Sequence, residues 1–367
     1  MDFSGLFFLG TLLTYTGIIV YVANQIDLIN QQPVPVRAGG GRTPPETSSP
    51  RWLSNPVVLR WLLYGLIVMM FVLGLTVFQL SMLGEAAMEL DEALPVVSPV
   101  TGILTFAAAA AVSLLSYRLV ASETLRQQVG AFLNRLGGSF KPESQVHLVA
   151  LLLMLAVVIW TLANFIMSGG VEGLAQDMTE DTLSAEDVIF QAVLEIVITL
   201  LGVGLAIRRD IPQTLQRLGL QVPTGREVLW GVGIGVVLLI FMNVFSQIWG
   251  TLVPVEVIEE QTSAAEALNL AFATLPLAFI LSVSAAVGEE IWIRGGLQPI
   301  FGLWVSSLFF ASLHIQVAFT PAILILFVVS LGMGWLRHRF STMAAIVAHF
   351  CFNFIPLALL ALSIGAA

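Results

Sequence analysis

Residues 146–168 read VHLVALLLMLAVVIWTLANFIMS, a run whose only ionisable side chain is that of His147. A helix of this length and composition can cross the hydrocarbon core of a bilayer, which requires roughly 17–25 apolar residues. The rest of the chain has the same character. Of its 367 residues, 57% are hydrophobic and 11% are charged, whereas soluble domains carry about 25% charged residues. The composition therefore excludes a water-soluble protein.

Comparable apolar runs recur along the whole chain, and they predict an all-α, polytopic bundle of about ten transmembrane helices. The runs lie at about 5–23, 57–82, 96–116, 146–168, 189–207, 228–250, 269–298, 300–318, 321–336 and 342–365. The first run is preceded by Asp2 and followed by Arg37, Arg42 and Arg51, a pattern typical of an uncleaved anchor with its N-terminus outside.

The charges of the connecting segments give the orientation. Thirteen of the 15 Lys and Arg residues lie in the segments 24–56, 117–145, 208–227 and 337–341, which the positive-inside rule places in the cytoplasm. In the alternate segments 83–95, 171–188 and 251–266, all the charged residues are acidic, so we expect these segments to be loops facing outward. With a net charge of −9 and the basic residues spread over several loops, a nucleic-acid partner is not expected. A multi-pass protein of the cytoplasmic (inner) membrane is predicted.

We divide the chain into three parts. Residues 1–56 form the anchor and a Pro/Gly-rich cytoplasmic linker from residue 28 on, residues 57–227 form N-terminal transmembrane helices without a recognisable role, and residues 228–367 carry the informative polar groups. The segments 119–136 and 210–222 have apolar residues at helical spacing among Arg and Gln, which fits either helices on the inner membrane surface or solvated connectors.

A glycine series, Gly231-x-Gly-x-Gly235, lies in the sixth apolar run. Glycines at such spacing allow two helix backbones to approach closely. We expect this series to let the sixth and seventh spans pack against each other.

Ionisable side chains inside a span cost at least about 2.5–3.5 kcal/mol each, so they indicate function by default. In this chain they cluster within the last hundred residues, at Glu289, Glu290, Arg294, His314 and His349, and Asn353 follows one turn later. Four other candidates lie near span boundaries or in a loop, and we assign them to structure. These are Arg60, His147, Glu195 and His338.

The spacing of these residues predicts a common depth. Glu289 lies twelve residues before Phe301, and His314 lies twelve residues after Gly302. If the chain reverses at Phe301 and Gly302, both side chains lie roughly 18 Å from the turn at about 1.5 Å per residue. His349 and Asn353 lie at a similar depth from the turn that precedes the last span, so all four groups can meet at one level, entered from the cytoplasmic side.

The two adjacent glutamates differ in their expected partners. Glu290 and Arg294 have the i,i+4 spacing of an ion pair on one helix face, whereas Glu289 points about 100° away. An unpaired carboxylate in an apolar site suits a general base. In the alternative interpretation, Glu289 and Glu290 share Arg294 as a folding clamp.

Three motifs in this region resemble those of the CPBP intramembrane proteases, which include the type II CAAX prenyl endopeptidases and the bacteriocin-processing Abi proteins. The motifs are Glu289-Glu290-x-x-x-Arg294, Phe310-x-x-x-His314 and His349-x-x-x-Asn353. The resemblance covers about residues 228–365. It implies that Glu289 and His314 activate a water molecule, that His349 and Asn353 stabilise the tetrahedral intermediate, and that Glu290, Arg294 and Phe310 shape the site.

The expected activity is therefore an intramembrane endopeptidase acting on a membrane-associated or lipidated substrate, as CAAX-processing enzymes do. We favour a reaction without a cofactor, although Glu289, His314 and His349 could instead hold a zinc ion. Two alternatives stay open at this stage. The chain could be a non-catalytic bacteriocin-immunity or scaffold protein of the membrane, or a transporter that uses these residues as a proton relay.

Overall fold

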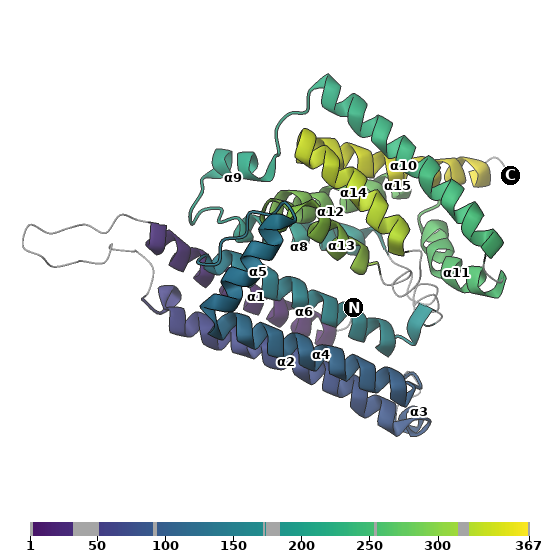
Figure 1. Cartoon of the computed structure of the whole chain (residues 1–367). Helices are drawn as coiled ribbons and strands as arrows, with labels where there is room; N and C mark the ends of the chain where they lie inside the picture. Colours follow the sequence, from purple (N-terminus) through teal and green to yellow (C-terminus); the bar gives the residue numbers. More distant parts are fainter. Residues whose placement is uncertain are drawn as a thin grey trace, which may run out of the picture.

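The computed structural model describes residues 3–31, 51–90, 94–171, 173, 184–252, 255–314 and 323–365. Within these residues the protein is helical and contains no β-strand, which confirms the predicted all-α class (Figure 1). In chain order the helices are α1 (Phe3–Gln31), η1 (Arg51–Ser54), α2 (Pro56–Leu83), α3 (Ala86–Leu90), α4 (Pro99–Ala121), α5 (Glu123–Arg135), α6 (Gln145–Met167), α8 (Ala185–Gly202), α9 (Ile211–Leu218), α10 (Gly225–Leu252), α11 (Val255–Ala271), α12 (Leu275–Glu290), η2 (Ile291–Leu297), α13 (Gln298–Ser312), α14 (Ile323–Arg339) and α15 (Thr342–Gly365).

Local sequence signals fix where several of these helices begin. The side chains of Asn55, Ser98 and Thr274 each accept a hydrogen bond from a backbone N–H in the first turn, at the N-termini of α2, α4 and α12. A proline occupies the first or second helical position of all three helices, where its missing N–H costs nothing. The polar residues at the ends of the apolar runs therefore act as helix caps.

Among the described residues, seven helical segments are long and apolar enough to cross a membrane, so the protein is an integral, multi-pass membrane protein. They cover Gly10–Asn30, Pro56–Leu83, Pro99–Ala121, Gln145–Met167, Gly225–Leu252, Leu275–Ser312 and Thr342–Gly365. Neither α8, with three acidic residues, nor α14, with 17 residues, is among them. The count of ten spans and the outside position of the N-terminus stay predictions.

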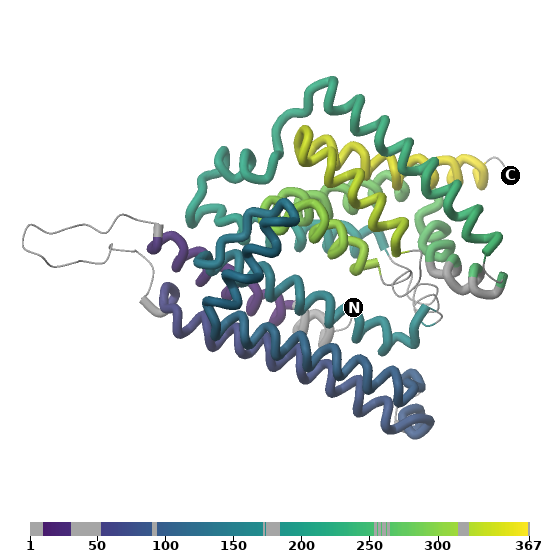
Figure 2. Tube along the Cα trace, viewed as in Figure 1, coloured from purple at the N-terminus to yellow at the C-terminus, as the bar shows by residue number. Residues whose placement is uncertain are grey.

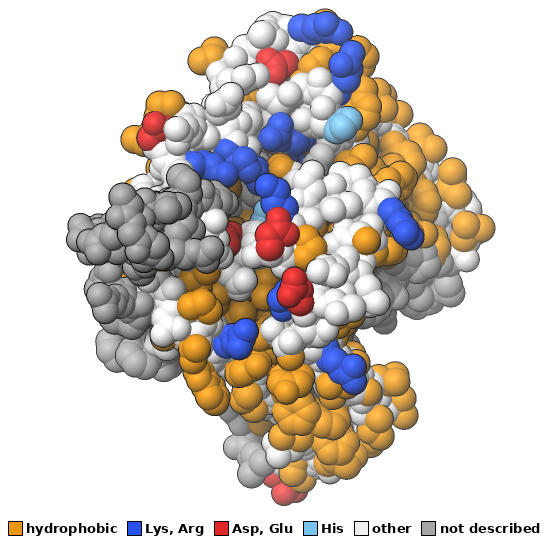
Figure 3. Space-filling view, turned by 60° about the vertical axis from the view of Figure 1, so that its left-hand side comes forward, with side chains coloured by type: hydrophobic (Ala, Val, Ile, Leu, Met, Phe, Trp, Pro, Cys, Tyr) orange, Lys and Arg blue, Asp and Glu red, His pale blue; other side chains and the backbone are white. Residues whose placement is uncertain are grey.

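The helices form two groups joined through α8. Figure 1 shows α1, α2 and α4 on one side of the molecule and α10, α14 and α15 on the other, and the chain trace in Figure 2 shows the same separation. Helix α8 packs along both α1 and α12, so it links the N-terminal group to the helix that carries the two adjacent glutamates. Figure 3 shows Lys and Arg side chains gathered on one face, beside a broad hydrophobic area.

The last two turns of α1 hold the ends of two neighbouring helices. Asp27 accepts hydrogen bonds from Ser144 Oγ at 2.6 Å and from the backbone N–H of Gln145 at 2.8 Å, and so caps α6. Asn24 donates to the carbonyl of Leu201 at 3.0 Å and accepts from Arg208 Nε at 2.7 Å. These buried contacts bring the C-terminal end of α1, the N-terminus of α6 and the C-terminus of α8 to one level.

The predicted reversal at Phe301 and Gly302 is present. Gly302 has φ 81° and ψ 173°, a conformation that breaks the helix and that glycine adopts without steric cost. Beyond it the chain folds back, because the rings of Trp292 and Phe309 lie 5.6 Å apart and Arg294 Cζ lies 5.2 Å from the ring of Phe310. The part of α13 after Gly302 therefore runs antiparallel to η2.

The prediction that the glycine series packs the sixth span against the seventh was wrong. Helix α10 packs against α15, the last span, and not against α12. A Cβ atom at Gly231 would lie 2.8 Å from the carbonyl oxygen of Ala344, and one at Gly235 would lie 2.7 Å from that of Ala348. The two glycines thus let α10 approach the backbone of α15 beside His349, while the space at Gly233 is open.

Other connecting segments confirm or correct the sequence analysis. The segment 251–266, expected to be an outward-facing loop, lies largely within helix α11. Helices α5 and α9 form in the segments 119–136 and 210–222, as their periodicity predicts. In the expected linker 28–56, helix α1 continues to Gln31 and η1 begins at Arg51. The part between lies outside the described residues.

Candidate active site

The first motif lies at a change of helix type. Helix α12 ends at Glu290 and continues without a break into η2, a π-helix that contains Arg294. Short π-helical segments within α-helices are frequently found at functional sites. A π-helix has more residues per turn than an α-helix. The side chains after Glu290 therefore point in other directions than they would in a continuous α-helix.

Glu290 has two hydrogen-bonded partners from two helices. Its Oε2 accepts from Arg294 Nε and its Oε1 accepts from His349 Nδ1, both at 3.0 Å. The exposed fractions are 0% for Glu290, 0% for Arg294 and 5% for His349. Arg294 Nη2 also donates to Ser330 Oγ of α14 at 2.9 Å. The pairing expected from the i,i+4 spacing is thus present, and it extends to α14 and α15.

Phe310 is the centre of a second set of contacts. Its ring lies 4.7 Å from the ring of His314 and 6.1 Å from that of His349, and Arg294 Cζ lies 5.2 Å from its centre. The carbonyl of Phe310 also accepts a hydrogen bond from His314 Nδ1 at 3.0 Å. In a neutral imidazole this leaves Nε2 of His314 with its lone pair free to accept a proton.

Glu289 differs from its neighbour. Its Oε2 is buried and has no hydrogen-bond partner within the part of the chain that the structure describes. A buried polar atom without a partner is costly in a folded protein, and a catalytic role is one explanation for such an atom. Of the two adjacent carboxylates, Glu290 has hydrogen-bond partners at both oxygens, whereas Glu289 does not.

Glu195 of α8 is a residue that the sequence analysis assigned to structure. It was taken to lie near a span boundary, but α8 begins at Ala185, so Glu195 lies in the interior of the helix. A Cβ atom at Gly288 would lie 2.6 Å from Glu195 Oε2, which places this carboxylate directly against the α12 backbone beside Glu289. The charges of Glu195 and Glu289 interact. The sequence contains a signal for Glu195, because this acidic residue lies within the apolar run 189–207.

The position of Asn353 is determined only by its place on helix α15. It lies one turn beyond His349 on α15 and is partly buried. Among the described contacts, no hydrogen bond joins it to the other residues of the motifs. The structure thus brings together Glu290, Arg294, Phe310, His314 and His349 through direct contacts, with Glu289 and Asn353 at adjoining positions on the same helices.

Two arginines support the π-helix from the outside. Arg217 Nη1 donates to the carbonyl of Gly295 at 2.8 Å, and Arg337 Nε donates to that of Arg294 at 3.2 Å. Burial, together with the charges of Arg209, Arg337 and Arg208, lowers the pKa of Arg217 to about 10. Helix α9 approaches η2 at Gly295, where a Cβ atom would lie 3.1 Å from Leu218 Cδ2.

Comparison with known families identifies this region. Residues 271–355 match the family model of Type II CAAX prenyl endopeptidase Rce1-like proteins. The likeness to that family is confined to this segment. The match includes every residue of the three motifs, from Glu289 to Asn353, and confirms the resemblance predicted from them. No curated protein and no solved structure matches the chain.

The Rce1-like segment begins at the end of α11 and ends within α15, so it covers α12, η2, α13 and α14. Glu195 of α8 and Arg217 of α9 lie before this segment, whereas Arg337 of α14 lies inside it. The helices of the segment hold the contacts among Glu290, Arg294, Phe310 and His349. The chain is therefore an integral membrane protein whose motif-bearing helices match the model of a CAAX-type protease family.

The zinc alternative concerns the donor groups of Glu289, His314 and His349. In the residues that the structure describes, no three His, Cys, Asp or Glu side chains come together as ligands for one metal ion. His349 Nδ1 is bonded to Glu290 and His314 Nδ1 to a backbone carbonyl. These hydrogen bonds leave Nε2 of both histidines available, as in zinc sites whose histidines are hydrogen-bonded through the other ring nitrogen, so the reaction without a metal stays a prediction.

Proposed function

We propose that the protein is an intramembrane endopeptidase that hydrolyses a peptide bond of a membrane-associated or lipidated substrate with water activated by Glu289 and His314. The observation that carries this proposal is the difference between the two adjacent glutamates. Glu290 is saturated by Arg294 and His349, whereas Oε2 of Glu289 is buried and has no protein partner among the described residues. A carboxylate free to accept a proton is what a general base requires.

The proposed reaction needs no covalent intermediate. Glu289 takes a proton from water, the water oxygen forms a bond to the substrate carbonyl carbon, and the carbonyl π electrons move onto the oxygen. When the tetrahedral intermediate collapses, the C–N bond breaks and its electron pair goes to nitrogen. The proton held by Glu289 is delivered to the leaving amine, so one water is consumed and the enzyme is restored.

His314 and His349 have different proposed roles. His314 donates through Nδ1 to the carbonyl of Phe310, so its Nε2 can accept from the attacking water and orient it. In its protonated form His349 donates from Nδ1 to Glu290 and from Nε2 to the developing oxyanion, with the Asn353 amide as a second donor. Fixed donors in a site shielded from water stabilise such a charge strongly.

The substrate class follows from the family and the setting of the site. Type II CAAX prenyl endopeptidases, by their name, act on prenylated CAAX sequences, and the helices that carry the site here are apolar on their outer surfaces. We propose a substrate that is held in the bilayer by a lipid or an apolar segment, cleaved from the cytoplasmic side of the inner membrane. The reaction is proposed to proceed without a metal ion.

The experiment that tests this function is cleavage of a membrane-tethered reporter by the purified full-length protein in proteoliposomes. Mass spectrometry should find two fragments whose masses sum to the reporter plus one water. His314→Gln should abolish the cleavage, while the matched substitution His338→Gln, at an exposed histidine of α14, should leave it unchanged. If lipidated and transmembrane reporters both stay intact with the wild-type protein, the proposed function is wrong.

A further inference from the structure

A large cavity lies outside the proposed catalytic residues. Its volume is about 880 Å³, within the range of about 300–1,000 Å³ that is typical of ligand pockets. It is lined by α1, α2, α6, α8 and η2, and most of its lining is apolar. Among the described residues that line it are Glu195, Trp292 and Gly296, but not Glu289, His314 or His349.

The cavity has an apolar part that runs along three helices. Leu12 of α1, Met69 of α2 and Leu153 and Trp160 of α6 line it. Trp160 lies 15 residues beyond the start of α6, which corresponds to roughly 22 Å along the helix at about 1.5 Å per residue. This distance is longer than the hydrocarbon part of one leaflet, about 15 Å, and shorter than the whole hydrocarbon core of about 30 Å.

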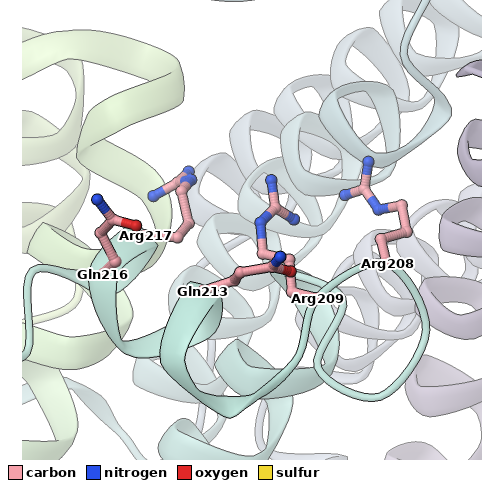
Figure 4. Close-up of a pocket in the computed structure, with 5 residues that line it drawn as sticks. All are labelled: Arg208, Arg209, Gln213, Gln216 and Arg217. Carbon is pink, nitrogen blue, oxygen red and sulfur yellow. The ribbon is translucent and has the colours of Figure 1, made fainter.

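The opposite end of the cavity is basic. Lys141, Arg208, Arg209 and Arg217 line it there, where α6 begins and α8 ends. Figure 4 shows the guanidinium groups of the three arginines pointing to the same side, and a smaller pocket of about 340 Å³ is lined by the same three residues with Gln213 and Gln216. The basic groups therefore face a common space.

The positive charge at this end is only partly balanced. Arg208 lies 3.7 Å from Asp27, a carboxylate that already caps α6. Arg209 and Arg217 donate to backbone carbonyls, those of Val203 and Gly295. Burial and the mutual repulsion of these groups lower the pKa of Arg217. Half-buried cations with so few counter-charges favour binding of an anion.

We propose that this cavity binds an anionic amphiphile, with its apolar chain between α1, α2 and α6 and its phosphate or carboxylate headgroup at Arg208, Arg209 and Arg217. The length of the apolar part, its volume and the basic end together fit such a molecule. The same chemistry has two sources, an anionic phospholipid of the membrane and a lipidated peptide that ends in a carboxylate. The inference does not depend on the proposed hydrolysis.

The test uses the full-length protein in detergent micelles and measures ligand binding by native mass spectrometry. The probes are dioleoylphosphatidylglycerol, dioleoylphosphatidylcholine, a farnesylated peptide with a free carboxylate, its methyl ester, and inorganic phosphate. We expect phosphatidylglycerol or the carboxylate peptide to bind at least tenfold more tightly than its neutral counterpart and than phosphate alone. Which of the two binds more tightly identifies the source.

Two variants locate the binding. Ala156→Trp fills the apolar part from α6 and Arg209→Gln removes one headgroup cation, and each should weaken binding of the anionic probe at least fivefold. The matched controls are Ala107→Trp on the exposed face of α4 and Arg135→Gln at an exposed position of α5, and both should bind as the wild type does.

A photoreactive acyl chain on phosphatidylglycerol gives a second measurement that does not depend on the folding of Ala156→Trp. In the wild-type protein it should label peptides of α6 or α2. Equal binding of anionic and neutral probes, or labelling restricted to the outer face of α4, would overturn the inference.

Discussion

Glu290 accepts one hydrogen bond from Arg294 Nε and one from His349 Nδ1, each at 3.0 Å, and so joins the π-helix after α12 to the last span. All three side chains are buried. With both oxygens engaged, Glu290 is a poor candidate for a base that takes protons from water. Its proposed role is to hold His349 in one orientation, which leaves proton transfer to Glu289.

Removal of Arg294 should destabilise the protein strongly. Arg294→Met leaves the carboxylate of Glu290 buried with only His349 as a partner, and breaking a buried pair in this way costs about 3–5 kcal/mol. The free energy of unfolding in mixed micelles measures the effect. Arg339→Met, at an exposed position of α14, is the control and should change it by less than about 0.5 kcal/mol. A loss as small as that for Arg294→Met would contradict a stabilising role of the pair.

Two glycines of α10 should differ in their response to alanine. Gly235→Ala places a Cβ atom 2.7 Å from the carbonyl oxygen of Ala348, and overpacking of this kind costs about 1–3 kcal/mol. Gly233 faces open space, so Gly233→Ala should stabilise the helix by up to about 1 kcal/mol. Thermal unfolding of the two variants side by side is the measurement. Equal melting temperatures would show that α10 does not pack on α15 through Gly235.

The contact between α8 and α12 should affect the rate as well as the stability. In Gly288→Ala the new Cβ atom would lie 2.6 Å from Glu195 Oε2 and 2.9 Å from Ala192 Cα, so α8 must move away from Glu289. A displacement of about 1 Å can reduce the rate roughly 10²-fold. The value of kcat for reporter cleavage should fall accordingly, whereas Gly202→Ala, in open space at the end of α8, should keep it. An unchanged kcat in Gly288→Ala would refute this coupling.

Dialysis against a chelator should leave the activity unchanged. The expectation rests on the proposed mechanism, in which Glu289 takes the proton from water directly and no step requires a metal ion. The measurement compares kcat/KM before and after dialysis against 1,10-phenanthroline, with metal content followed by mass spectrometry. Activity that is lost on dialysis and returns with added zinc would require a metal-dependent mechanism.

The sequence predicts those features that local spacing determines. The i,i+4 pair of Glu290 and Arg294 and the reversal at Gly302 both follow from positions along one segment, and both are present in the structure. The same holds for the helical segments α5 and α9, which have apolar residues at regular spacing.

Features that depend on which helices become neighbours could not be predicted. The glycine series of α10 indicates close packing but carries no information on its partner, which is α15. Glu195 was expected near a span boundary because hydropathy locates the ends of an apolar run poorly. Its position beside Glu289 follows only from the packing of α8 on α12. Charge alone also predicted a loop where α11 forms, since acidic residues occur in helices too.

The central claim is that Glu289 is the base, and the most direct measurement is kcat/KM of Glu289→Gln in proteoliposomes. The variant keeps the size of the side chain but cannot take a proton, so we expect a loss of about 10²–10⁴-fold with an unchanged melting temperature. Glu186→Gln, an exposed carboxylate at the start of α8, is the matched control and should retain wild-type activity. Full activity of a folded Glu289→Gln protein would contradict the account.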